Sequence, residues 1–454
     1  MREGHTPLGL RNLSGFVRTP LRFLQSTHAR AGDVAEFSML GAPWMLLTHP
    51  DDIADFFSRR EEDLGRDAYI EILKRALGLG LLTSEGELWR RQRRLASVAF
   101  TPKRIKGYAP RMSLVTSAGL RRWSSGETID LHAEMSRLTM EVVADVLFGA
   151  SVAPKDVTTV RESLEVFNEF FAQSPEAILR VPAWVPTPRN LRMKRAVADV
   201  DELIYRIIDA RRRGGEERDD LLGALLSAKE DDGTGMDDRQ LRDETVTLFL
   251  AGHETTALAL VHALYLLGRH PHHEARMLRE LGEVLGGRLP TEADVPRLVF
   301  TERVIKEAMR LYPPAWLTGR EARRDIELAG RPVRKGTQVL VSQWLVHRDP
   351  RWFADPEAFD PDRFAPEAVS ARPKFSYFPF GGGARVCIGS HFAMMEAVLM
   401  LACIAQRFHV SLLPFEQLSF APSVTLRPQH GIRARLEARD VSTTALAATA
   451  IDAE

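Results

Sequence analysis

The chain has 454 residues, 44% of them hydrophobic, and its 61 basic side chains balance its 61 acidic ones. A net charge of zero argues against broad nucleic-acid binding, which leaves a basic footprint. Two cysteines are too few for a secreted disulfide framework, and charges interrupt the N-terminal segment too often for a signal peptide or a membrane-spanning helix. We therefore expect a cytoplasmic protein without a transmembrane anchor.

Few segments have the pattern of β-strands. Residues 35–48 hold two short apolar runs around Gly41-Ala42-Pro43 and predict a hairpin. Residues 326–341 hold β-type runs separated by turn residues, and residues 424–436 can hold another pair of strands.

Most of the remaining chain has helical periodicity. The segments with this pattern are residues 68–77, 106–124, 131–148, 156–172, 191–212, 219–229, 238–269, 271–285, 299–311 and 389–407. Since no linker divides them, we predict a single, mainly helical domain with small β-sheets, an α+β fold, over residues 1–440. We expect residues 1–20 to be loosely ordered and residues 441–454 to form a disordered tail.

The longest predicted helix, residues 238–269, is the most informative. Asp237 or Asp238 can cap it, its middle carries almost no charge, and Pro271 follows its end. A helix that is apolar on most faces is buried at the centre of a domain or spans a membrane. Polar ends and Glu254 at the centre favour the buried helix.

A glycine-rich loop, FPFGGGARVCIGSHF at residues 378–392, places Cys387 directly before a predicted helix. A cysteine at a helix N-terminus ionises readily, and a thiolate is a nucleophile or a metal ligand. The loop lacks the Gly-Lys-Ser/Thr ending of a phosphate loop, and it has too few ligands for zinc. A protease nucleophile, a thiolate ligand of porphyrin iron and a small residue in a tight turn all remain open.

This loop resembles the haem-binding loop of the cytochrome P-450 superfamily. The matching positions are Phe380, Gly381, Gly383, Arg385, Cys387 and Gly389. The resemblance implies a haem b cofactor that lies between the long central helix and the cysteine loop. Cys387 would be the axial ligand of the iron, Gly381–Gly389 would wrap its sulfur, and Phe380 would pack near the thiolate. Arg385 would pair with a haem propionate.

A second match lies in the middle of the long helix, where Ala251-Gly252-His253-Glu254-Thr255-Thr256 interrupts the apolar sequence. His253-Glu254 also begins a zinc-protease motif, but Ala257 stands where that motif needs its second histidine. The resemblance implies a helix that kinks over the oxygen side of the haem, with Ala251 against the cofactor. Thr255 would hydrogen-bond dioxygen and the waters that protonate it, and Glu254 would relay protons from solvent.

Further matches concern residues that would bind the haem propionates and residues that would stabilise the surrounding fold. The resemblance assigns Trp89, Arg93 and Arg320 to the haem propionates. It also implies that Glu307, Arg310 and Arg363 form a buried ion cluster, although taken alone such pairs are usually surface bridges of little value.

Basic side chains cluster around the Trp89 segment. Arg90, Arg91 and Arg94 fit a solvated helix face, and together with Lys103, Arg104 and Lys106 they can form a patch that steers an acidic redox partner. The resemblance implies a ferredoxin or flavodoxin-type partner, which would pass on electrons that come ultimately from NAD(P)H.

The resemblance covers residues 30–436 and implies a soluble, bacterial-type haem-thiolate monooxygenase, which we expect to be a monomer. It would insert one oxygen atom from dioxygen into an apolar substrate, most simply by hydroxylation of a fatty acid, terpenoid, steroid or carotenoid. The pocket would use residues 69–82, 167–171, 249–251, 315–317 and 423–424. A peroxide-driven peroxygenase, an isomerase and a haem-thiolate sensor or electron carrier are the alternatives.

Overall fold

The structure is a computed structural model. It describes residues 9–149, 153–173, 181–214, 220–228, 233–414 and 416–439, so the predicted disordered tail lies outside the described residues. Helices make up most of the described chain, and the strands form four small sheets. The predicted α+β architecture is confirmed in this respect.

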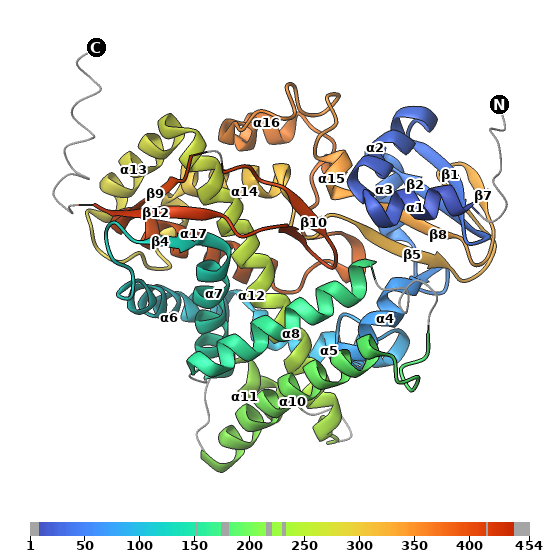
Figure 1. Cartoon of the computed structure of the whole chain (residues 1–454), viewed down its shortest axis with the longest axis horizontal. Helices are drawn as coiled ribbons and strands as arrows, with labels where there is room; N and C mark the ends of the chain where they lie inside the picture. The colour runs from blue at the N-terminus through green and yellow to red at the C-terminus, as the bar shows by residue number, and fades with distance from the viewer. Residues whose placement is uncertain are drawn as a thin grey trace.

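The helices account for the bulk of the molecule (Figure 1). Their bounds are α1 (Leu10–Arg18), α2 (Pro20–Ala31), α3 (Pro50–Ser58), α4 (Ala68–Leu77), α5 (Gly86–Ser97), α6 (Pro102–Leu120), α7 (Leu131–Phe148), α8 (Pro154–Gln173), α10 (Pro188–Gly214), α11 (Leu221–Ser227), α12 (Asp238–Arg269), α13 (Pro271–Leu285), α14 (Val299–Leu311), α15 (Gln343–Val346), α16 (Pro366–Ser370) and α17 (Ser390–Arg407).

Three helical predictions need correction. The segment expected to be loosely ordered contains α1, which Asn12 ties to Ser38 through a 3.0 Å hydrogen bond from its amide to the backbone carbonyl. The helix predicted at residues 106–124 begins earlier, at Pro102, because proline is favoured in a first helical turn, where its missing N–H costs nothing. Helices α3 and α5 lie outside the predicted helical segments.

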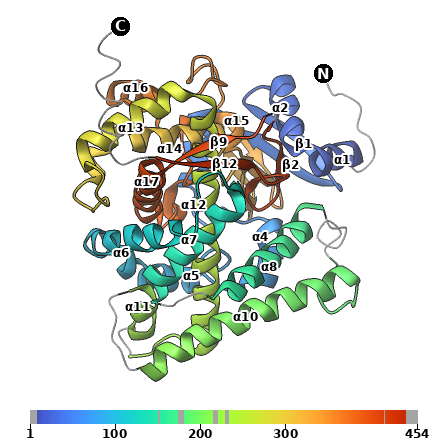
Figure 2. The same cartoon turned by 60° about the vertical axis from the view of Figure 1, so that its left-hand side comes forward.

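Helix α12 runs through the middle of the molecule, and α7, α10, α14 and α17 pack against it (Figures 1 and 2). Asp237 caps the helix by accepting a 2.7 Å hydrogen bond from the backbone N–H of Gln240, as predicted. At about 1.5 Å per residue, 32 residues give a helix roughly 48 Å long. Among the described residues, no helix combines the length and hydropathy that a bilayer span requires.

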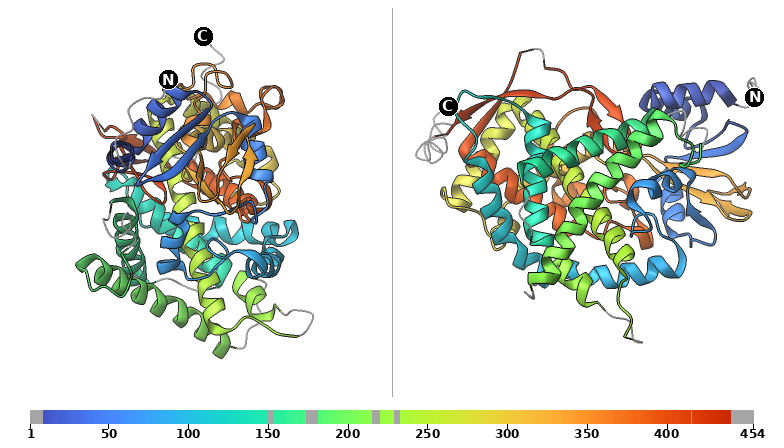
Figure 3. Two further views of the ribbon diagram at one scale, coloured as in Figure 1. Left: turned by 90° about the vertical axis from the view of Figure 1, so that its right-hand side faces the viewer. Right: turned by 60° about the horizontal axis from the view of Figure 1, so that its bottom comes forward.

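The largest sheet has the strand order β1-β2-β8-β5-β3 and lies with α1–α3 at one edge of the molecule (Figures 1 and 3). The strands are β1 (Val34–Met39), β2 (Ala42–Leu47), β3 (Leu64–Arg66), β4 (Thr128–Asp130), β5 (Thr318–Ala322), β6 (Ile326–Leu328), β7 (Arg331–Val333), β8 (Gln338–Val341), β9 (Phe408–Leu412), β10 (Phe420–Pro422), β11 (Leu426–Pro428) and β12 (Arg433–Ala438).

The structure confirms the hairpin predicted at residues 35–48 and the two strands predicted at residues 424–436. Strands β1 and β2 pair antiparallel, as the pattern of residues 35–48 predicts. Strands β11 and β12 exist, but they do not pair with each other. Strand β11 pairs with β10, and β12 lies between β4 and β9, because partners from residues 128–130, 408–412 and 420–422 occupy their edges.

Candidate active site

Hydrogen bonds within the backbone of the cysteine loop hold its conformation. The N–H of Cys387 donates a 3.0 Å hydrogen bond to the carbonyl of Phe380, and the N–H of Gly381 donates a 2.9 Å bond to that of Phe378. Gly383 has a φ of +65°, and a Cβ atom there would lie 2.1 Å from the carbonyl oxygen of Phe57. Only glycine fits this left-handed position under α3. The loop leads into α17, whose N-terminus faces Cys387.

The side chain of Cys387 is accessible even though protein surrounds it. This burial raises the pKa of the thiol. The N–H of Gly389 and the positive charge of Arg93 oppose this rise and do not cancel it. The expectation that the thiol ionises readily is therefore wrong for the protein alone. A bound metal ion deprotonates a coordinating thiol, so this sulfur suits a metal ligand better than a free nucleophile.

The middle of α12 borders an open space. Ala251 is exposed although its neighbours Leu250 and His253 are buried, and Thr255 is half-buried one turn further along. The hydroxyl of Thr255 donates a 2.8 Å hydrogen bond to the carbonyl of Ala251. Such back-bonding bends a helix slightly. The helix is continuous from Asp238 to Arg269.

Glu254 and Thr255 form hydrogen bonds with different parts of the fold. Its carboxylate Oε1 accepts a 2.9 Å hydrogen bond from the hydroxyl of Thr425, in the turn between β10 and β11. The ring of His253 lies against Phe249, and its Nδ1 meets the carbonyl of that residue at 3.0 Å. The two predicted catalytic residues are thus adjacent in the chain but held by different parts of the fold.

A histidine that the sequence reasoning missed lies near Glu254. Burial lowers the pKa of His132, at the start of α7, and the negative charge of Glu254 partly opposes this. Nothing in the local sequence of α7 marks His132, because only the packing of α7 against α12 brings it to the glutamate.

The side chain of Arg385 lies at the centre of a group of arginines. Its guanidinium pairs with Glu61, donates a 2.8 Å hydrogen bond to the carbonyl of Ser84 and lies 4.3 Å above the ring of Trp89. The sequence reasoning predicted both Arg385 and Trp89 but missed Glu61, which comes from the chain after α3. The Nη1 atom of Arg385 is buried and has no hydrogen-bond partner within the described parts of the chain.

Two further arginines lie beside Arg385, and each comes from the five-stranded sheet. Arg66 in β3 lies opposite Arg320 in the neighbouring antiparallel strand β5. Burial is the main cause that lowers the pKa of Arg66 to about 9 and that of Arg320 to about 10, and the positive charge of Arg385 lowers both further. Arg320 donates to the backbone carbonyls of Phe56 and Arg59 at 3.0 and 3.2 Å. The sequence reasoning missed Arg66, which belongs to no motif.

In this arginine cluster, defined as Arg66, Arg320 and Arg385, only Arg385 has an ion-pair partner among the described residues, namely Glu61. The Nε atom of Arg66 is buried and, among the described residues, has no hydrogen-bond partner. Buried cations without partners are strongly destabilising, so the cluster calls for an anion from outside the chain. The two carboxylates of a haem fit this requirement, as the accessible Cys387 fits the requirement for an iron ligand.

The buried ion cluster on α14 matches the prediction. Arg310 donates to both carboxylate oxygens of Glu307 at 2.7 and 2.8 Å, and both side chains are fully buried. Arg363 lies 3.4 Å from the same carboxylate. This cluster holds the segment that precedes the cysteine loop against α14.

Comparisons with known proteins agree with this geometry. A profile described as cytochrome P450 matches residues 10–432. The chain is 41% identical to cyclooctatin synthase and 35% identical to cyclooctat-9-en-7-ol 5-monooxygenase, both from Streptomyces melanosporofaciens, over 90% of this chain in each case and 90% and 89% of those proteins. The crystal structure of cytochrome P450DA heme domain superposes with a TM-score of 0.85 at 27% identity and covers 96% of this chain and 97% of that one. The chain therefore belongs to the cytochrome P450 family and is a haem-thiolate monooxygenase.

Proposed function

We propose that this monooxygenase hydroxylates a terpenoid, with Cys387 as the thiolate ligand of haem b. The substrate class is supported by the relatives, one of which is named for a reaction on cyclooctat-9-en-7-ol. The accessible side chains of Ala251 and Ala315 support an open space beside α12 in which small residues leave room for a bulky apolar body. When bound, haem supplies the activation of dioxygen, and a thiolate ligand assists cleavage of the O–O bond.

The residues around the site have separate tasks in this proposal. Trp89, Arg93 and the arginine cluster hold the propionates, and Phe380, Gly381 and Gly389 shape the pocket of the sulfur. Ala251 keeps the face of α12 flat enough for the cofactor.

Thr255 and Glu254 deliver protons in this proposal. The hydroxyl proton of Thr255 is engaged by the carbonyl of Ala251, so its oxygen is free to accept a hydrogen bond from a water in the open space. The carboxylate of Glu254 is engaged by Thr425 and must leave that hydroxyl, or act through it, to pass on a proton.

Electrons come from NAD(P)H through a separate ferredoxin or flavodoxin-type protein in this proposal, with the chain acting as a cytoplasmic monomer. The basic surface on α5 and α6 supports such a partner only in part. Arg90 pairs with Glu87, and Arg91 donates to Gln240 and to the carbonyl of Gly235. Lys103 and Lys106 are exposed at the start of α6 and supply the accessible charge.

The accessible yet enclosed Cys387 is the observation that carries the proposal, and a carbon monoxide spectrum of the reduced protein tests it. We expect the red-shifted band of a thiolate-ligated haem. Cys387→Ser should abolish this band, whereas Cys403→Ser, which changes a buried cysteine in α17, should keep it. A histidine-type band in the unmodified protein would overturn the assignment. Incubation with terpenoid substrates and partner proteins, followed by mass spectrometry, then checks for a gain of one oxygen atom.

A further inference from the structure

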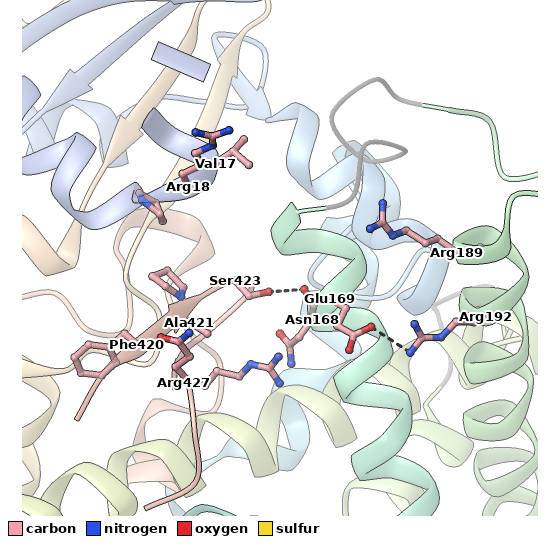
Figure 4. A pocket seen from close by; sticks show the side chains of 13 residues that line it. Val17, Arg18, Asn168, Glu169, Arg189, Arg192, Phe420, Ala421, Ser423 and Arg427 are labelled. Carbon is pink, nitrogen blue, oxygen red and sulfur yellow. Dashed lines mark hydrogen bonds and ion pairs between the residues drawn. The ribbon is translucent and has the colours of Figure 1, made fainter. Parts of the chain in front are cut away.

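A hollow lies beside the β10–β11 hairpin, and its lining includes residues 168, 169 and 423 from segments expected to form the substrate pocket. It has a volume of about 410 Å³ and is lined by residues of α1, α8, α10 and the β10–β11 hairpin (Figure 4). The residues that line it are Val17, Arg18, Pro20, Asn168, Glu169, Arg189, Arg192, Phe420, Ala421, Pro422, Ser423, Arg427 and Gln429. This arginine pocket is built from four segments that are distant in the sequence.

Positive charge dominates the arginine pocket. Four arginines and a single glutamate line it, although the whole chain has no net charge. Glu169 is engaged by Arg192 at 3.1 Å, so these two charges neutralise each other. Arg427 is half-buried, and within the described chain no carboxylate lies in ion-pair distance of it. A concave wall of one charge concentrates its field and attracts an anion.

The opposite wall of the arginine pocket is apolar. Phe420, Ala421 and Pro422 from β10 form it together with Val17 and Pro20. Figure 4 shows Arg427 reaching from the hairpin toward α8, so charged and apolar surfaces face the same hollow. This combination fits a ligand that has an anionic group attached to a hydrocarbon body.

The β10–β11 hairpin separates the arginine pocket from the catalytic side. Ser423 lines the pocket, and its hydroxyl donates to the carbonyl of Asn168 at 3.1 Å while its own carbonyl accepts from the indole of Trp316 at 3.0 Å. Two residues further on, Thr425 donates to Glu254. The turn between β10 and β11 thus contacts the arginine pocket through Ser423 and the predicted proton relay, Glu254, through Thr425.

We propose that the arginine pocket binds the carboxylate of an amphipathic isoprenoid acid, whose hydrocarbon body lies against the apolar wall of the pocket. This inference rests on the proposed function, because the isoprenoid class of the acid is taken from the proposed substrate class. Guanidinium groups bind carboxylates in bidentate geometry, and Arg427 and Arg18 line the hollow from different elements. Glu169 in the wall disfavours a group with several negative charges, so a carboxylate fits better than a phosphate.

Calorimetric titration of the haem-loaded, full-length protein tests this pocket. The probes are farnesoic acid and methyl farnesoate, which share one hydrocarbon body and differ in charge. We expect the acid to bind about tenfold more tightly than the ester, which corresponds to about 1.4 kcal/mol. Arg427→Gln should reduce this ratio to below about threefold. Arg161→Gln removes the same charge from the exposed face of α8 without touching the pocket, and should preserve the ratio.

A salt titration of the unmodified protein repeats the test without a variant. Raising sodium chloride from about 20 mM to about 500 mM should weaken binding of the acid and leave the ester unaffected. Equal affinities for acid and ester, or a ratio that survives Arg427→Gln, would overturn the proposal. Tighter binding of farnesyl phosphate than of farnesoic acid would overturn the choice of a carboxylate.

Product analysis separates this inference from the proposed function. If methyl farnesoate is oxidised but the acid has no binding advantage, the arginine pocket is refuted while the monooxygenase assignment stands. If the acid binds preferentially but neither compound nor any other terpenoid is oxidised, the proposed substrate class is refuted while the anion site stands.

Discussion

At the scale of single residues, burial changes the pKa of a carboxyl group and thereby the pH dependence of stability. Glu396 lies fully buried in α17, and burial raises the pKa of its side chain to about 8, which the nearby hydroxyl of Thr256 only partly opposes. Because this pKa exceeds the value of 4.5 for a free side chain, the folded state favours the protonated acid. The resulting stability is fully present below about pH 4.5 and is lost as the pH rises through about 8.

Glu396→Gln should therefore stabilise the protein progressively as the pH rises. Between about pH 6 and pH 8, the free energy of unfolding of the variant should gain about 1.4 kcal/mol per pH unit over that of the parent protein. Urea unfolding at a series of pH values measures this difference. Glu87→Gln, an exposed substitution on α5, serves as the control and should show no such trend. Parallel curves for Glu396→Gln and the parent would refute the burial argument.

At the scale of elements, the first turns of α12 fasten the loop between α4 and α5. The carboxylate of Asp243 accepts a 2.7 Å hydrogen bond from the N–H of Leu79, and that of Glu244 accepts a 3.1 Å bond from the N–H of Leu81. Gly80 lies so close to α12 that a Cβ atom would stand 2.1 Å from the hydroxyl oxygen of Thr247. The backbone of the loop that we expect to border the substrate is thus held by side chains of α12, in addition to the hydrogen bonds of its own Thr83 and Ser84.

Asp243→Ala should loosen this loop. Removing a charged acceptor from a buried N–H costs about 1.5–3 kcal/mol, so amide hydrogen exchange at residues 79–83 should become faster. Exchange in α13 should stay unchanged, because α13 lies at the other end of α12. Asp238→Ala removes an exposed carboxylate from the same helix and is the matched control. Unchanged exchange at Leu79 in Asp243→Ala would show that packing alone holds the loop.

At the scale of the whole molecule, the arginine cluster joins segments that are far apart in the chain. Arg66 in β3, Arg320 in β5 and Arg385 in the cysteine loop meet only after the sheet and the loop have formed. Their repulsion destabilises the fold until an anion is bound, so cofactor binding and folding are coupled.

Arg66→Gln should have opposite effects on the two forms of the protein. In the haem-free form it removes a buried, unpaired charge and should raise the thermal unfolding midpoint. In the haem-loaded form it removes a propionate partner, and haem should transfer to apomyoglobin several-fold faster, which the Soret absorbance records. Arg324→Gln, an exposed substitution near the same sheet, should change neither quantity. A lower midpoint in the haem-free form would refute the role of Arg66 as an unneutralised cation.

Local patterns explain what could be predicted. Helices α4, α7, α12, α13 and α14 begin and end where their periodicity and their caps predict, because these signals act within a few residues. The cysteine loop could be recognised for the same reason, since its glycines and its cysteine lie within ten residues.

Strand pairing, by contrast, is a property of distant segments. Residues 424–436 carry strand patterns, but the partners of both strands come from elsewhere in the chain, so the local pattern predicted the strands and not their pairing. The early start of α6 likewise depends on a proline position that periodicity does not resolve.

The sequence by itself determined the family and the long central helix, and it supplied the residue that we propose as the iron ligand, because each is encoded in a contiguous stretch whose chemistry is local. Only the tertiary structure decided the electrostatics. It raised the pKa of Cys387 by burial, brought Arg66 and Glu61 to Arg385, and turned Glu254 toward Thr425. The arginine pocket also depends on the tertiary structure, since its charges come from α1, α8, α10 and the β10–β11 hairpin. Burial and charge depend on which surfaces meet, and that is set by packing rather than by sequence spacing.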